Sequence, residues 1–151
     1  MFKKVFALLS LLLIISGCGY VAVYKGVAKF NYKILVSEHT GDRDMINLIN
    51  TRLKKYSKIK SDENFIIKID TIYQKNIIAK DTAGKATDYQ IKVTSNFNIK
   101  SEVINKIIKI NETFNVKAMD NKFEEQRYDT IIKNNIANTI VKRIILQLSR
   151  N

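Results

Sequence analysis

Side chains able to do covalent or acid–base chemistry are sparse in this sequence. It has one cysteine, Cys18, and one histidine, His39, among 151 residues. A single thiol and a single imidazole cannot form a Cys/His zinc site or a disulfide within the chain. His39 falls in the polar stretch His39-Thr40-Gly41-Asp42, and no pattern pairs it with a nucleophile, so we expect an ordinary loop histidine.

The carboxylates also lack a catalytic or metal-binding pattern. Asp42 and Asp44 are typical of a helix start, and their spacing lacks the further ligands and the glycine of a calcium loop. The acid pairs at 62–63 and 124–125 are expected in solvated turns. Glu112 interrupts an apolar register, which predicts a β-bulge or a strand end. The sequence therefore predicts a protein that is not an enzyme and has no metal site and no cofactor.

Cys18 ends a segment with the layout of an export signal. Lys3 and Lys4 precede an apolar run, Val5–Ile15. That run suits a signal peptide and is shorter than the about 20 apolar residues needed to cross a bilayer. Ile15-Ser16-Gly17-Cys18 resembles the lipobox of bacterial lipoprotein signals, in which the cysteine thiol is lipidated and the chain is cut before it. The alternative is an N-terminal membrane anchor with an incidental cysteine.

The lipobox predicts how the chain is organised. We expect residues 1–17 to be a lipoprotein signal peptide, 18–29 a lipidated tether and 30–151 a single α+β domain. Several acyl chains on Cys18 would hold the protein firmly to a membrane, whereas one chain binds only marginally. In enterobacterial lipoproteins an aspartate after the cysteine favours the inner membrane. Gly19 stands there instead, so the resemblance favours the periplasmic face of the outer membrane.

Hydrophobic periodicity predicts the order β-α-β-β-β-α. Alternating apolar residues indicate strands, and apolar residues three or four apart indicate helices. The predicted elements are a strand from 30 to 37, a helix from Asp42 to Tyr56, strands at 64–79, 88–100 and 108–117, and a helix carrying the stripe Ile132, Ile136, Ile140, Ile144 and Leu148. A glycine-containing stretch, 80–86, should turn the chain between the second and third strands.

These elements predict a two-layer α+β sandwich. Two amphipathic helices can cover one face of a four-stranded sheet, and the first strand must pair after a helical excursion, which favours a mixed sheet. The other face stays open, because alternating strands with polar outer positions bury one side only. The lysines expected on this open face are Lys33, Lys68, Lys92, Lys100, Lys109 and Lys117.

The basic charge admits an anionic partner without identifying one. The formal net charge is +12, but only 5 of the 26 basic residues are arginine, the bidentate phosphate reader. The abundance of lysine, isoleucine and asparagine is equally consistent with an A/T-rich genome. An exported protein is not expected to bind nucleic acid.

Three stretches of the chain resemble the LPS-assembly lipoprotein LptE family. Cys18-Gly19-Tyr20 with Tyr24 resembles the family's opening, although Ala22 stands where the family has proline. Ile78–Ala83 with Ala86–Gln90 resembles its hairpin between the second and third strands. Glu125–Asp129 resembles the approach to its last helix. The likeness covers essentially the whole chain after Cys18.

The resemblance implies a non-catalytic function. LptE plugs and supports the outer-membrane β-barrel LptD and binds lipopolysaccharide (LPS) during LPS assembly. It implies two basic contacts for LPS: Lys85 in the hairpin loop, and a second near the start of the last helix that is either Lys122 or Arg127. Cations there would contact lipid A phosphates through charge-assisted hydrogen bonds. The alternative is a generic periplasmic lipoprotein, a structural or protein-interaction module that does not bind LPS.

Overall fold

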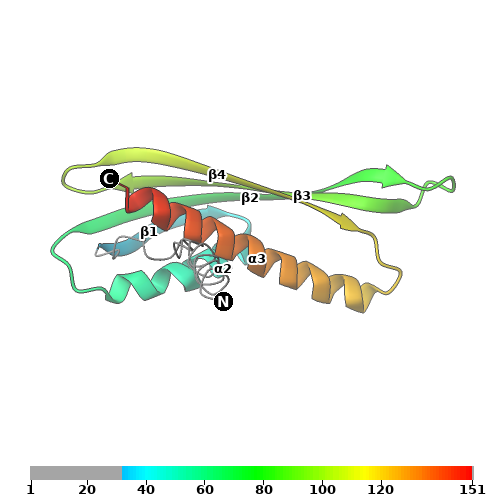
Figure 1. Ribbon diagram of the computed structural model, residues 1–151, viewed down its shortest axis with the longest axis horizontal. Helices are drawn as coiled ribbons and strands as arrows, with labels where there is room; N and C mark the ends of the chain where they lie inside the picture. The colour runs from blue at the N-terminus through cyan, green and yellow to red at the C-terminus, as the bar shows by residue number, and fades with distance from the viewer. Residues whose placement is uncertain (1–31, 151) are drawn as a thin grey trace, which may run out of the picture.

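The computed structural model describes residues 32–150, and the predicted signal peptide, Cys18, the tether and Phe30 lie outside this range. The element order is β-α-β-β-β-α, as predicted (Figure 1). The elements are β1 (Lys33–Gly41), α2 (Arg43–Leu53), the 3-10 helix η2 (Lys54–Lys58), β2 (Asn64–Lys80), β3 (Ala86–Lys100), β4 (Asn105–Lys117) and α3 (Lys122–Leu148).

The four strands form one mixed sheet in the order β1-β2-β3-β4. β1 runs parallel to β2, and α2 connects them, whereas β2, β3 and β4 form an antiparallel meander. Both helices lie on the same side of the sheet (Figure 1). The predicted two-layer α+β sandwich with a mixed sheet is therefore confirmed.

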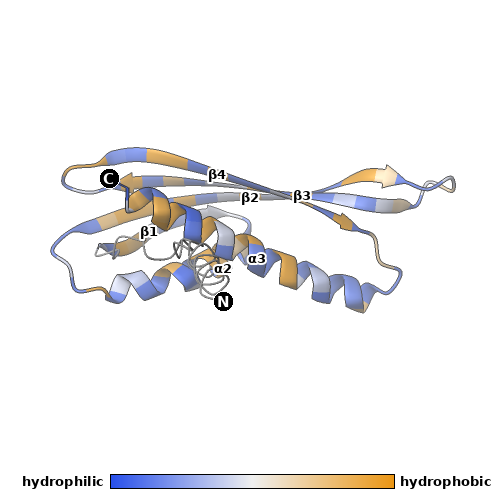
Figure 2. Ribbon diagram, in the orientation of Figure 1, coloured by the Kyte–Doolittle hydropathy of each residue, from blue (hydrophilic) through white to orange (hydrophobic). Residues whose placement is uncertain are grey.

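The core lies between this covered face and the helices. Inward residues of the strands alternate with outward polar ones, as in β3, where Ile91, Val93 and Phe97 are fully buried. The isoleucine stripe of α3 packs against them, and Ile136, Ile140 and Ile144 are also fully buried. Apolar colour is denser along the C-terminal half of α3 than along its N-terminal half (Figure 2). Burial of this stripe is what holds the helix on the sheet.

Helix α2 starts where the sequence predicts. The side chain of Asp42 caps it by accepting a hydrogen bond from the Met45 backbone N–H at 2.9 Å. Gly41, just before the cap, has a φ of +103° and lies against the backbone of Thr71. The Asp42 N–H donates to the Thr71 carbonyl oxygen at 2.8 Å. A glycine is needed because a Cβ at position 41 would overlap that carbonyl.

The end of β1 and the start of α3 are among the boundaries that differ from the predictions. β1 continues through His39 to Gly41, with an irregularity in the register between Val36 and Glu38, so His39 is a strand residue and not a loop residue. The bulge keeps the strand paired through the polar stretch that was expected to end it. α3 begins at Lys122, ten residues before its apolar stripe, because Asn121 caps it and its first turns need no buried residue.

The explanation expected for Glu112 is wrong. It lies in the middle of β4, directly opposite Val93, and the β3–β4 register shows no bulge there. Its side chain points into the covered face and is 9% exposed, and one of its oxygens lies 2.8 Å from a guanidinium nitrogen of Arg143 on α3. The acid fits in the apolar register because a cation from the covering helix reaches it.

Candidate functional site

Lys85 lies in the turn that joins β2 to β3. Asp81 organises this turn, because its carboxylate accepts hydrogen bonds from the backbone N–H groups of Ala83, at 3.0 Å, and of Lys85, at 2.8 Å. Gly84 supplies the positive φ, +82°, that closes the turn. The turn spans fewer residues than predicted, since β3 already begins at Ala86. The structure thus places Lys85 at the far end of a long hairpin (Figure 1).

The ammonium group of Lys85 has a partner that sequence reasoning missed. Its Nζ lies 2.6 Å from a carboxylate oxygen of Asp120, in the segment between β4 and α3. The hydrogen bond and the opposite charge raise the pKa of Lys85 and lower that of Asp120. The two side chains are 67% and 92% exposed, so water competes with the pair and the lysine can exchange it for another anion.

Lys122 lies at the same end of the molecule as Lys85. It is the first residue of α3, two positions after Asp120. Arg127 lies five residues further along the helix, which at 100° per residue turns its side chain to a different side from that of Lys122. Both side chains are exposed, and neither forms an ion pair with a residue in the range 32–150. Lys122 is thus close in sequence to Asp120, the partner of Lys85, whereas Arg127 points to another side of α3.

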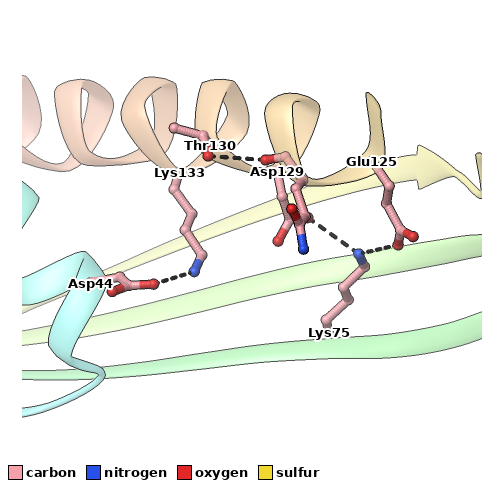
Figure 3. A network of polar contacts seen from close by, with 7 residues as sticks. Asp44, Lys75, Glu125, Asp129, Thr130 and Lys133 are labelled. Carbon is pink, nitrogen blue, oxygen red and sulfur yellow. Dashed lines mark hydrogen bonds and ion pairs between the residues drawn. The ribbon is translucent and has the colours of Figure 1, made fainter. Parts of the chain in front are cut away.

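A polar network fastens the N-terminal half of α3 to the sheet. Lys75 on β2 bonds to Glu125 at 2.9 Å and to Asp129 at 3.2 Å (Figure 3). Its ammonium group also lies 4.7 Å from the ring centre of Tyr89. Burial alone would lower the pKa of Lys75, but the hydrogen bonds that it donates to the two carboxylates raise it on balance. The lysine therefore stays charged and links the sheet to α3 through two ion pairs.

A second ion pair continues this network towards α2. Lys133 on α3 lies 2.8 Å from Asp44 (Figure 3). The hydrogen bond to Lys133 lowers the pKa of Asp44. Lys133 also lies 4.9 Å from the ring centre of Tyr73, whose pKa burial raises to about 12. Asp44 thus joins the two helices, and together with the Asp42 cap this accounts for the carboxylates at the start of α2.

The open face of the sheet carries exposed cations, as predicted. Lys92, Lys100, Lys109 and Lys117 are exposed, and no carboxylate of the described range forms an ion pair with them. The expectation holds less well for Lys68, which pairs with Glu38 at 2.7 Å, and for Lys33, which is half-buried.

Neutral amides and hydroxyls lie between these lysines, together with exposed isoleucines such as Ile66, Ile72 and Ile107. Gln90 bonds to Asn115 at 3.3 Å, and Thr94 bonds to Asn111 at 2.9 Å, across the β3–β4 pair. This surface offers many hydrogen-bond donors and acceptors with an excess of positive charge. It is suited to hydrated anionic groups and has no nucleophile–base arrangement.

Residues 32–150 contain no group of histidine, cysteine, aspartate and glutamate side chains placed to hold a metal ion. In the same range, no helix has the length and apolar character needed to span a membrane.

The fold and its surfaces define a small two-layer α+β protein whose open sheet face carries lysines, amides and hydroxyls beside exposed isoleucines. Searches found no matching family description and no matching curated protein. Solved structures do match the fold. Rare lipoprotein B from Shewanella oneidensis is 10% identical, with a TM-score of 0.52 over 75% of this chain and 92% of the other. Uncharacterized lipoprotein B from Nitrosomonas europaea is 13% identical, with a TM-score of 0.51 over 78% of this chain and 82% of the other. The chain therefore has a lipoprotein B-like, LptE-like fold.

Proposed function

We propose that this chain is an outer-membrane lipoprotein that binds LPS and plugs or supports an LptD-type β-barrel during LPS assembly. Lipids on Cys18 anchor it to the periplasmic face of the membrane. The lipobox and the lipoprotein B-like fold support the anchor, and the LptE resemblance supports the two partners.

The observation that carries the proposal is the open face of this lipoprotein B-like sheet. Four exposed lysines without carboxylate partners lie there among amides and hydroxyls. LPS presents phosphates and sugar hydroxyls, which need charged donors and neutral hydrogen-bonding groups. The lumen of a large β-barrel is also polar, so the lysines, amides and hydroxyls of this face suit contact with its wall.

Lys85 is the residue we propose for a phosphate contact, with Lys122 at the same end of the molecule as a second candidate. A phosphate at the hairpin end displaces Asp120 from Lys85 and takes over its charge-assisted hydrogen bond. Asp120 therefore competes with the ligand for the same ammonium group. Lys85 is exposed, so replacing it removes an anion contact without removing core packing.

Binding of purified protein to LPS at two salt concentrations tests this assignment. Lys85→Glu should weaken binding several-fold at low salt and less at high salt, because salt screens exposed charges. Asp120→Asn is the matched variant: it removes the competing carboxylate and should strengthen binding. Both variants should melt within about 2 °C of wild type, as expected for exposed charges. If Lys85→Glu binds as wild type does at both salt concentrations, Lys85 is not the contact.

Two further measurements test the anchor and the barrel. Cys18→Ala should abolish incorporation of labelled fatty acid, and incorporation into this variant would contradict the lipobox assignment. Pull-down of the tagged wild-type protein from solubilised membranes should recover a large β-barrel protein. A free monomer that also fails to bind LPS would favour the alternative, a generic lipoprotein interaction module.

A further inference from the structure

A pocket lies at the end of the sheet opposite the β2–β3 hairpin, away from Lys85 and Lys122. The start of β2, the turn between β3 and β4, and the last turn of α3 enclose it. Its volume is about 620 Å³. Small-molecule sites in proteins commonly measure about 300–1,000 Å³ and combine an apolar lining with a few polar groups.

The wall of this pocket is aromatic and aliphatic. Phe65 and Leu148 are core residues that also line it, so its floor is continuous with the core. The ring of Tyr32 lies against that of Phe65, with 4.9 Å between the ring centres. Ile104 completes the apolar lining at the turn. Such a surface gains free energy by covering an alkyl or aromatic group.

The turn between β3 and β4, which borders the pocket, exposes the apolar side chain of Val103 to solvent. Val103 is 86% exposed, although turns normally carry small or polar residues. Its position is fixed, because the Ser101 N–H donates to the Ile104 carbonyl at 2.7 Å and the Ile104 N–H donates to the Ser101 hydroxyl at 3.1 Å. The fold thus presents Val103 at the mouth of an apolar pocket.

The charge at this mouth is opposite to that of the whole protein. Asp62, Glu63 and Glu102 line the pocket, against one cation, Lys100. Within residues 32–150 none of these three carboxylates forms an ion pair. In a chain of net charge +12, three unpaired acids around an apolar pocket favour a cationic group there.

We propose that this pocket binds a small cationic amphiphile, an alkyl or aromatic group that ends in an ammonium. The apolar part lies against Phe65, Ile104 and Leu148, and the ammonium lies among the carboxylates at the mouth. An amphiphile with an anionic head is disfavoured by the same carboxylates. The site is therefore distinct in place and in preferred charge from the proposed phosphate contact at Lys85.

Three probes that differ only in their head group test the proposal: octylammonium, octanol and octanoate. The protein used is the chain from residue 19 onward, produced without Cys18 and therefore without lipid; its hydrophobic core lies within residues 32–150. Each probe is titrated into this protein below its critical micelle concentration. Binding is followed by amide NMR shifts at 65, 101–104 and 148. Octylammonium should bind on the order of tenfold more tightly than octanol at low salt, and octanoate should bind most weakly.

Variants separate the apolar and the charged contributions. Glu63→Gln combined with Glu102→Gln should reduce the preference for octylammonium over octanol several-fold and leave octanol binding unchanged. Val103→Ser should weaken all three probes. Glu124→Gln, an exposed acid at the other end of the molecule, is the matched control and should change nothing.

If none of the three probes binds, the proposal is overturned. Equal affinity for octylammonium and octanol would overturn the part played by the carboxylates. Shifts confined to residues outside the pocket would overturn its location. A failure here leaves the LPS proposal intact, because the phosphate contact proposed at Lys85 lies outside this pocket and the probes are different.

Discussion

The two halves of the sheet are held together in different ways. Near α2 and the C-terminal half of α3, the inward residues are buried in an apolar core, as Ile67, Val93 and Ile140 are. Towards the β2–β3 hairpin, β2 has no buried residue after Thr71, and the first ten residues of α3 have none either. There the layers are joined by Lys75 and its two carboxylate partners. We therefore expect the half near α2 to contribute most of the stability of the fold, and the half near the β2–β3 hairpin to be less tightly packed and more exposed.

The strongest test of this contrast is a charge in the packed half. Val93→Asp buries a carboxylate directly opposite Glu112, a second acid of the covered face. We expect a loss of several kcal/mol in the free energy of unfolding, measured by chemical denaturation. Lys92→Asp is the control on the open face and should have a mild effect. Equal tolerance of both would contradict the register of β3.

Alanine substitutions at Gly41 and Gly84 compare how much backbone strain each half of the sheet tolerates. Gly41→Ala brings a Cβ onto the Thr71 carbonyl in the packed half, whereas the space around Gly84 at the hairpin tip is empty. Both have positive φ, so each alanine carries a backbone strain of about 1 kcal/mol. Gly41→Ala should cost about 2 kcal/mol more than Gly84→Ala because of the overlap. Similar melting temperatures for the two variants would show that the backbone of β1 shifts to relieve the overlap with Thr71 at little cost.

Breaking the ion pair between Glu112 and Arg143 should have a smaller effect on the free energy of unfolding than Val93→Asp. Arg143→Met leaves Glu112 buried without its cation, and we expect a loss of about 1–3 kcal/mol, less than for a fully buried pair because Arg143 is 52% exposed. Adding Glu112→Gln should restore most of that loss. A double-mutant cycle by urea denaturation measures the coupling. Additive losses would show that the two side chains act independently.

Alkaline pH tests the boundary between the halves. The pKa of Tyr73 is raised from 10.0 to about 12 in the folded protein, chiefly by burial. A raised folded-state pKa gives stability that is complete below the unfolded pKa and is lost as pH rises through the folded one. Wild type should therefore lose stability between about pH 10 and 12, and Tyr73→Phe should lose less over that window. Identical pH profiles would mean that Tyr73 is equally solvated in both states.

Local patterns predicted most of the fold because they depend on neighbours in the sequence. The alternation in β3, the Asp42 cap and the isoleucine stripe of α3 each reflect contacts within one element or one face. The start of α3 was missed, since its first turns carry no apolar stripe. The end of β1 was missed because a bulge continued its pairing.

The site was less predictable because its contacts join distant residues. Lys85 could be placed in a hairpin turn from nearby residues, but its partner Asp120 is 35 positions away. The ion pair between Glu112 and Arg143 likewise depends on how α3 crosses β4. The pocket beside Phe65 combines residues from four separate segments, which no local pattern in the sequence brings together.

The parallel pairing of β1 with β2 has a consequence for the order of folding. The hairpins β2–β3 and β3–β4 close over short turns, whereas β1 pairs with β2 only after α2 has been traversed, with Lys33 opposite Asn64. Pairing of distant segments is slow because the intervening loop must close first. In a chain that emerges from its N-terminus, β1 is synthesised first among the strands, and we expect it to join the sheet last.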